Sequence, residues 1–206
     1  TDVAAAYAAM RKRYGGDPMI LHFFDGVESI LSDRAIHLEK DVLKALGPEQ
    51  AWILDWKPGD QEPSFLFAAE IARPAEMRAT ADRLAGLLRE FGGPDLVIER
   101  TTGPGNATVY SLVTGKPDSP QPTVAFKDRL LVASFGPGPV RTALERLEKP
   151  GPTLADNPVF KQSLENMPAL VSHVRYVDDR AVFERAYGAV RPGLILLGRF
   201  MPALRK

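Results

Sequence analysis

The order of apolar and polar residues between 94 and 135 predicts two consecutive β-hairpins. Four apolar runs are separated by segments rich in glycine, proline or charged residues, and these runs cover 96–102, 108–113, 123–126 and 130–135. Consecutive hairpins form an antiparallel meander, because strands joined by a tight turn run in opposite directions. Two earlier strands are expected at 51–56 and 64–71, where apolar residues follow one another or alternate.

Apolar residues at three- and four-residue steps predict helices on both sides of these hairpins. The clearest helix runs from Pro74 to Phe91, ends at two glycines, and has one buried stripe formed by Met77, Ala81, Leu84, Leu88 and Phe91. Pro139 suits the first position of a second helix, and Asn157 suits the N-cap of a third. Helices that flank an antiparallel meander predict an α+β fold rather than a doubly wound parallel sheet.

The two ends of the chain suggest a weak internal repeat. Residues 19–24 form a nearly continuous apolar run, which predicts a strand buried on both faces, and a helix follows it. Residues 170–177 predict a second such strand, and Asp178 then caps the next helix. Segments 3–35 and 156–190 therefore form two related strand–helix modules, or they are unrelated and share only a similar pattern.

The composition is that of an ordinary globular chain, with 45% hydrophobic and 25% charged residues. Its 26 basic and 26 acidic residues cancel, which argues against a dedicated nucleic-acid binder, because phosphate contacts require basic residues in excess. At 206 residues we predict a single α+β domain that covers 1–206. No apolar run approaches the roughly 20 residues of a spanning helix, so membrane association is expected only through a segment absent from this chain.

The sequence contains no recognisable set of nucleophile, base and orienting group, and we therefore predict no catalytic, cofactor-binding or metal-binding residue. The chain has no cysteine, which excludes thiolate metal sites and cysteine nucleophiles. If the repeat holds, His22 and His173 occupy equivalent strands beside Asp25 and Asp178, and a hydrolase or metal enzyme is then an alternative. The segment 135–139 lies where phosphate loops occur, but its two prolines lack the N–H donors that such loops use.

Trp52 and Trp56 are the candidate interaction residues. They lie four positions apart on the strand expected at 51–56, so they share one face of that strand. They form either part of the core or an aromatic contact surface for a partner. A separate hypothesis places an apolar small ligand between the sheet and the helix at 74–91, in a cavity lined by Phe65, Phe67, Leu84 and Leu88.

The second half of the chain resembles a bacterial extracytoplasmic family of domains of unknown function. The resemblance rests on an acidic-Asn-Pro helix start, a helix end at proline, and an apolar strand before a short helix, carried by Leu154, Ala155, Asp156, Asn157, Pro158, Phe160, Leu164, Met167, Pro168 and Asp178. The preceding hairpin over 124–135 also fits the family pattern. The resemblance implies a location in the periplasm or cell envelope and a role without catalysis.

Three functional hypotheses follow. The first is a structural or protein-interaction domain of the bacterial cell envelope, not an enzyme, that works with protein partners in a larger assembly. The second is a carrier or sensor of an apolar small ligand. The third is a hydrolase or metal enzyme that uses His22 or His173.

Overall fold

The computed structural model describes residues 3–14, 16–56, 63–93, 95–116, 119–165 and 174–200. The chain divides into two compact units, the first formed by Thr1–Ile53 and Phe65–Gly151 and the second by Leu54–Ser64 and Pro152–Lys206. The first unit contains most of the sheet and both hydrophobic clusters. The prediction of a single domain over 1–206 stays a prediction.

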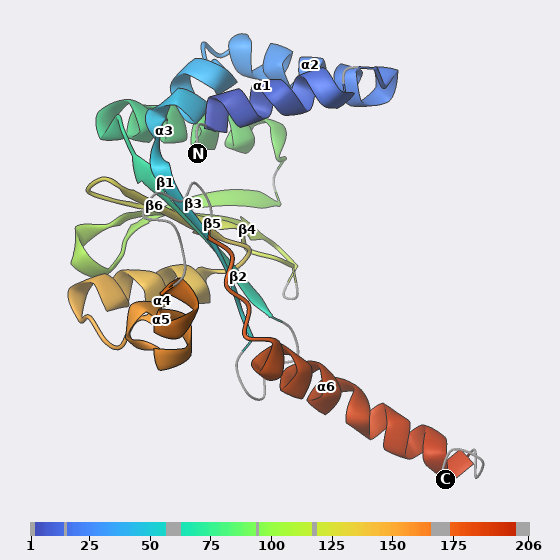
Figure 1. Ribbon diagram of the computed structural model, residues 1–206. Coiled ribbons are helices and arrows are strands. Elements are labelled where there is room, and N and C mark those ends of the chain that lie inside the picture. The colour runs from blue at the N-terminus through green and yellow to red at the C-terminus, as the bar shows by residue number, and fades with distance from the viewer. Residues whose placement is uncertain are drawn as a thin grey trace. The chain divides into compact units, whose positions relative to one another are not determined.

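The described residues form a six-stranded antiparallel sheet accompanied by helices, which confirms the predicted α+β class. Its strands are β1 (Leu46–Asp55), β2 (Ser64–Ile71), β3 (Leu96–Thr102), β4 (Thr108–Thr114), β5 (Thr123–Lys127) and β6 (Leu130–Ser134). They lie in the order β1-β2-β6-β5-β4-β3. The predicted meander is therefore β3 to β6, and the β1–β2 pair adds to its β6 side (Figure 1).

Local turn chemistry sets the register of the meander. Lys127 pairs with Leu130, so the β5–β6 turn consists of Asp128 and Arg129, and Asp128 has a φ of 50°. Aspartate tolerates this left-handed conformation better than most residues do, which suits it to a tight hairpin turn. The β2–β6 pairing instead joins distant segments, with Phe67 opposite Ala133 and Glu70 opposite Leu130.

Two hydrophobic clusters cover the two faces of the sheet. On one face, α3 (Pro74–Phe91) contributes to a cluster composed of Ala45, Ile71, Met77, Ala85, Ile98, Tyr110, Phe126 and Leu131. On the other, α4 (Pro137–Glu148) contributes to a cluster composed of Ala107, Ala125, Val132, Val140 and Leu144. Figure 1 shows α3 and α4 on opposite sides of the strands. The alternation of side chains along each strand sends neighbouring residues into different clusters.

The buried positions of α3 differ from the predicted single stripe. Met77 is buried as expected, but Leu88 and Phe91 are 42% and 66% exposed, whereas Thr80 and Leu87 are buried. The expected burial therefore fails at Leu88 and Phe91, whereas the polar residues Arg78, Asp82, Arg83, Arg89 and Glu90 are exposed, as expected of a helix packed on one side. α3 also contacts the short helical turns η1 (Leu38–Val42) and η2 (Leu43–Ala45), which precede β1.

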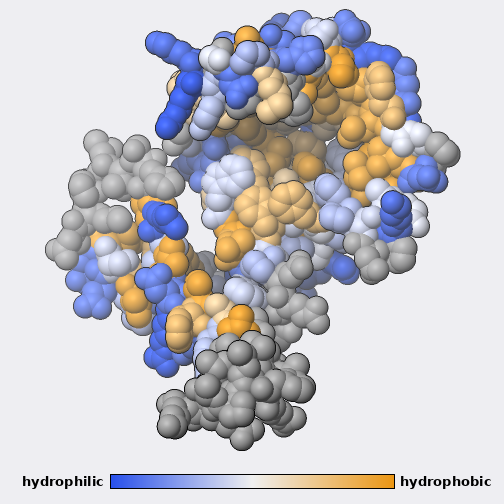
Figure 2. Space-filling model, turned by 90° about the vertical axis from the view of Figure 1, so that its right-hand side faces the viewer, coloured by the Kyte–Doolittle hydropathy of each residue, from blue (hydrophilic) through white to orange (hydrophobic). Residues whose placement is uncertain are grey.

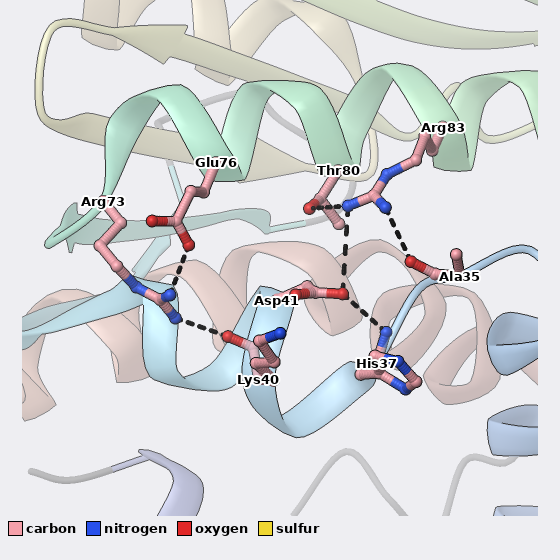
Figure 3. A network of polar contacts seen from close by, with 8 residues as sticks. All are labelled: Ala35, His37, Lys40, Asp41, Arg73, Glu76, Thr80 and Arg83. Atoms are coloured by element: carbon pink, nitrogen blue, oxygen red, sulfur yellow. Dashed lines mark hydrogen bonds and ion pairs between the residues drawn. The ribbon is translucent and has the colours of Figure 1, made fainter.

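Two arginines of the α3 region hold the segment before β1 (Figure 3). Arg83 donates hydrogen bonds to the Ala35 carbonyl, with Nη1 2.7 Å from the oxygen, and to Thr80 Oγ1 at 3.1 Å. Its Nη2 lies 4.0 Å from Asp41 Oδ2, and Asp41 accepts a hydrogen bond from the His37 backbone N–H. Arg73 donates to the Lys40 carbonyl and pairs with Glu76. These contacts fix the chain path that leads into β1.

Residues 18–32 form a helix, so the strand predicted at 19–24 is wrong. Helix α2 (Pro18–Ser32) packs against α1 (Val3–Tyr14). Asp17 accepts a hydrogen bond from the Met19 backbone N–H at 2.9 Å, and Pro18 begins the helix. An aspartate followed by proline favours a helix start, and this local signal outweighs the apolar run.

The α1–α2 pair is joined by one polar cluster. Tyr7 donates its phenolic O–H to Glu28 Oε1 at 2.8 Å, and its ring lies edge-to-face with Phe24. Arg11 pairs with Glu28 at 2.9 Å and also with Asp25. Burial, together with the hydrogen bond to Glu28 and the charge of Glu28, raises the pKa of Tyr7 from 10.0 to about 12.

A pH titration tests this contact. Because the folded state holds the Tyr7 proton more tightly than the unfolded state, Tyr7 stabilises the fold below about pH 10, and this contribution is lost as the pH rises to about 12. The difference in ultraviolet tyrosinate absorbance between the wild type and Tyr7→Phe is expected to titrate near pH 12. Glu28→Gln serves as the control and should move that midpoint toward 10. A midpoint near 10 in the wild type would contradict the contact.

The second unit contains α5 (Pro158–Leu164) and α6 (Asp179–Phe200). The predicted N-cap is confirmed, because Asn157 Oδ1 accepts hydrogen bonds from the backbone N–H groups of Val159 and Phe160. Asp178 likewise accepts from the Ala181 N–H at 2.9 Å, which confirms its predicted capping role.

The strand predicted at 170–177 is wrong for residues 174–177, which form neither helix nor strand; residues 170–173 lie outside the described part. In their described residues, 3–35 and 156–190 therefore contain helices but no strand, and the predicted strand–helix modules are not observed. None of the described helices has the length and apolar character needed to span a membrane.

A candidate interaction surface

Four aromatic side chains meet in the first unit: one from β1, two from β2 and one from the residue that follows β6. The Trp52 ring lies 4.5 Å from the Phe67 ring and 5.5 Å from the Phe65 ring, measured between centroids, and Phe65 lies 5.5 Å from Phe135. We call Trp52, Phe65, Phe67 and Phe135 the aromatic surface. The three ring pairs are tilted at 36–45°, within the separation at which aromatic rings attract one another.

Strand alternation places these rings on the face of the sheet that α3 covers. Phe65 and Phe67 alternate along β2 with Leu66 and Ala68, which pack on the α4 cluster. Phe67 also packs against the α3 cluster, so the aromatic surface continues this core toward solvent. The side chains lie toward the end of β2 that is farther from Ile71, the residue buried beneath α3.

Hydrogen bonds to their backbone carbonyls hold two of these aromatic residues in place. Ser134 Oγ donates to the Phe65 carbonyl at 2.6 Å, and the Ser134 residue is only 8% exposed. The Gln121 backbone N–H donates to the Phe135 carbonyl at 3.0 Å. The rings of Phe65 and Phe135 therefore rest on a constrained backbone, which reduces the conformational entropy that binding would cost.

The aromatic surface is open to solvent. Trp52 is 68% exposed and Phe135 is 66% exposed, and Phe65 and Phe67 are half-buried. Figure 2 shows hydrophobic side chains reaching the surface on one face of the molecule. Single exposed apolar residues are common, but contiguous exposed apolar patches mark interaction sites. The four contacting rings make such a patch.

Trp52 and Trp56 do not lie together on one regular strand. β1 ends at Asp55, and Trp56 follows it in the second unit, where its carbonyl accepts a hydrogen bond from Arg185 Nε at 3.2 Å. The Trp52 side chain is too exposed to be core, whereas Trp56 is half-buried. The predicted pair is therefore divided, and the rings next to Trp52 are those of Phe65 and Phe67.

The residues proposed for the enzyme hypothesis are not assembled in the described part of the chain. His22 is exposed on α2, and Asp25, on the same helix, pairs with Arg11. His173 lies outside the described residues, and Asp178 caps α6. Among the described residues, no group of three or more histidine, aspartate and glutamate side chains could hold a metal ion. The prediction that the chain is not an enzyme stays a prediction.

The four residues proposed to line a ligand cavity have different environments. Phe65 and Phe67 contact other rings of the aromatic surface, Leu84 is half-buried on α3, and Leu88 is 42% exposed. The connection from β6 to α4 consists of Phe135 and Gly136, with Gly136 as the N-cap, so the helix begins at Pro137 and not at the predicted Pro139. Its Gly136 N–H points to Ser134 Oγ at 3.4 Å, in keeping with the predicted turn.

Sequence reasoning missed Phe135 and the role of Phe65 and Phe67 as neighbours of Trp52. Phe135 follows directly after β6, and its contact with Phe65 depends on the β2–β6 pairing between distant segments. The alternation of Phe65 and Phe67 along β2 was the available signal for a shared aromatic face.

Comparisons with protein-family models, with curated proteins and with solved structures found no match to this chain.

Proposed function

We propose that this chain is a protein-interaction domain of the bacterial cell envelope, without catalytic activity, and that it binds its partner through the aromatic surface. The observation that carries the proposal is the exposure of Trp52, whose ring contacts Phe65 and Phe67, and of Phe135, whose ring contacts Phe65. The cell-envelope location is supported by the resemblance of the second half of the chain to an extracytoplasmic family.

The energetics favour a protein partner at this surface. Burying a large apolar side chain away from water stabilises a complex by about 1.5–3 kcal/mol. Aromatic residues are also enriched at the centres of protein interfaces. Trp52 and Phe135 are already held beside other rings, so their ordering on binding costs little entropy. The surface can therefore supply a small set of dominant contacts.

Site-specific crosslinking tests the proposal. A photoreactive phenylalanine analogue is placed at Trp52 or at Phe135 in the full chain, expressed in the source organism, with Val97 on β3 as the matched control. Val97 is 50% exposed and lies on the opposite edge strand of the sheet. We expect the analogue at 52 and at 135 to form the same protein adduct, and the analogue at 97 to form none of it.

The adduct is then identified by mass spectrometry, and both purified proteins are mixed to measure the Kd. Trp52→Ala is expected to weaken this binding about tenfold or more, because it removes a central aromatic contact. Identical adducts from all three positions, or a Kd that Trp52→Ala leaves unchanged, would contradict the proposed surface.

A further inference from the structure

The aromatic surface adjoins an open edge of the sheet. β1 is the terminal strand and pairs only with β2 among the described strands. Every residue from Ala51 to Asp55 is exposed. An edge strand presents a row of backbone N–H and C=O groups that a further strand can pair with. Among the described residues, no side chain forms a hydrogen bond with the backbone of residues 51–53.

The opposite edge of the sheet is protected in ways that residues 51–53 of β1 are not. On β3, Arg89 donates a hydrogen bond to the Ile98 carbonyl at 3.0 Å. Arg100 lies over the Tyr110 ring and 3.6 Å from Asp82. Charged side chains and covered backbone groups discourage an added strand. Residues 51–53 of β1 are Ala, Trp and Ile, without a charge or a proline, so this edge is the one suited to pairing.

The side chains of β1 define the chemistry of the added segment. Trp52, which belongs to the aromatic surface, is 68% exposed. Ile53 is 45% exposed, and strand alternation directs its side chain to the other face of the sheet. An added strand would therefore gain from apolar side chains on both faces. In the first unit, the charged residue of β1 is the acidic Glu49, which makes no ion pair in the described part of the chain. A basic residue in the partner segment complements this edge.

We infer that the partner contributes an extended apolar segment with a basic residue, which adds to β1 as a further strand and covers Trp52. This inference rests on the proposed function, since it names how the aromatic surface is occupied. A second copy of β1 is a poorer occupant, because it brings only acidic charges to an acidic edge. Strand addition combines backbone hydrogen bonds, which supply affinity, with side-chain contacts, which supply specificity.

A peptide experiment on the full chain tests the inference. The probe is a synthetic peptide in which phenylalanine alternates with valine behind an N-terminal arginine, so that both of its faces are apolar. A second peptide has the same side chains but N-methyl groups on alternate backbone amides, so it cannot complete a strand ladder. A third has glutamate in place of the arginine. Binding is measured by the change in Trp52 fluorescence in a Trp56→Phe background and, for Trp52→Ala, by isothermal titration calorimetry.

We expect the parent peptide to bind, N-methylation to weaken binding about tenfold or more, and the glutamate peptide to bind less well than the arginine peptide. Glu49→Arg should reverse the preference between the arginine and glutamate peptides, and Val97→Ala on β3 should leave every Kd unchanged. Equal binding of the parent and N-methylated peptides, lost in Trp52→Ala, would overturn strand addition while leaving the aromatic surface intact. Absence of peptide binding would overturn the inference, and the crosslinking experiment tests the proposed function separately.

Discussion

Ile71→Ala is expected to lower the free energy of unfolding by about 2–5 kcal/mol, the cost of removing a large aliphatic side chain from a packed core. Ile71 is fully buried in the cluster beneath α3. Its backbone N–H also donates to the Arg129 carbonyl at 2.7 Å, at the end of the β2–β6 pairing. The substitution leaves a cavity where the β1–β2 pair joins the meander, so it weakens the attachment of the strands that carry Trp52, Phe65 and Phe67.

Chemical denaturation followed by circular dichroism measures this loss. Ile53→Ala is the matched control, because Ile53 is also on a strand but is 45% exposed. The control should cost less than about 1 kcal/mol, since strand preference alone spans about that range. Equal losses in the two variants would show that Ile71 is not in the core of the sheet.

Leu144→Ala is expected to destabilise the chain by a similar amount, about 2–5 kcal/mol, from the opposite face of the sheet. Leu144 is 1% exposed on α4 and packs in one cluster with Val132, Val140, Ala107 and Ala125. The small side chains of Ala125 on β5 and of Ala107 just before β4 let α4 pack close to the sheet, so few neighbouring atoms can move to fill the space left by the leucine. The cavity term should therefore be large.

Leu147→Ala provides the control on the same helix. Leu147 is 46% exposed, so its truncation removes little buried surface. The alanine that replaces it has a high helix propensity, so the helix itself is not weakened. Thermal unfolding monitored by calorimetry should show a clear decrease in Tm for Leu144→Ala and little change for Leu147→Ala. A larger decrease in the control would mean that α4 is rotated relative to the sheet.

Local patterns were sufficient for most of the sheet and for the helix starts. The observed bounds of β2, Ser64–Ile71, agree with the alternation of Phe65, Phe67, Ala69 and Ile71, and the bounds of α3 agree with its starting proline and terminal glycines. The Asn157 cap was also predictable, because its contacts are with residues two and three positions away. These features depend on neighbours in the sequence.

The prediction failed where an apolar run has two structural solutions. Residues 19–24 are apolar enough for a buried strand or a helix, and periodicity alone does not separate the two. Asp17 and Pro18 begin a helix there, which then packs against α1. The strand expected at 174–177 likewise has no observed strand structure, although residues of this type favour strands.

The aromatic surface was predictable only in part. The sequence alone singled out Trp52 and predicted that Phe65 and Phe67 lie on one face of their strand. It did not show whether Trp52 is core or surface, because burial depends on which strand or helix covers it. Nor did it show that Thr80 and Leu87 of α3 are buried or that α3 contacts η1 and η2, because both depend on tertiary contacts.

The sequence by itself determined the α+β class, the hairpins of the meander and the capped helix starts, because each arises from side-chain periodicity or from hydrogen bonds between near neighbours. Only the tertiary structure decided that β2 pairs with β6 and that β1 forms an edge. It also decided that Phe135 contacts Phe65 and that Trp52 is exposed. These outcomes depend on contacts between residues far apart in the chain. A local pattern specifies which face of a strand is apolar but not which distant strand will lie beside it.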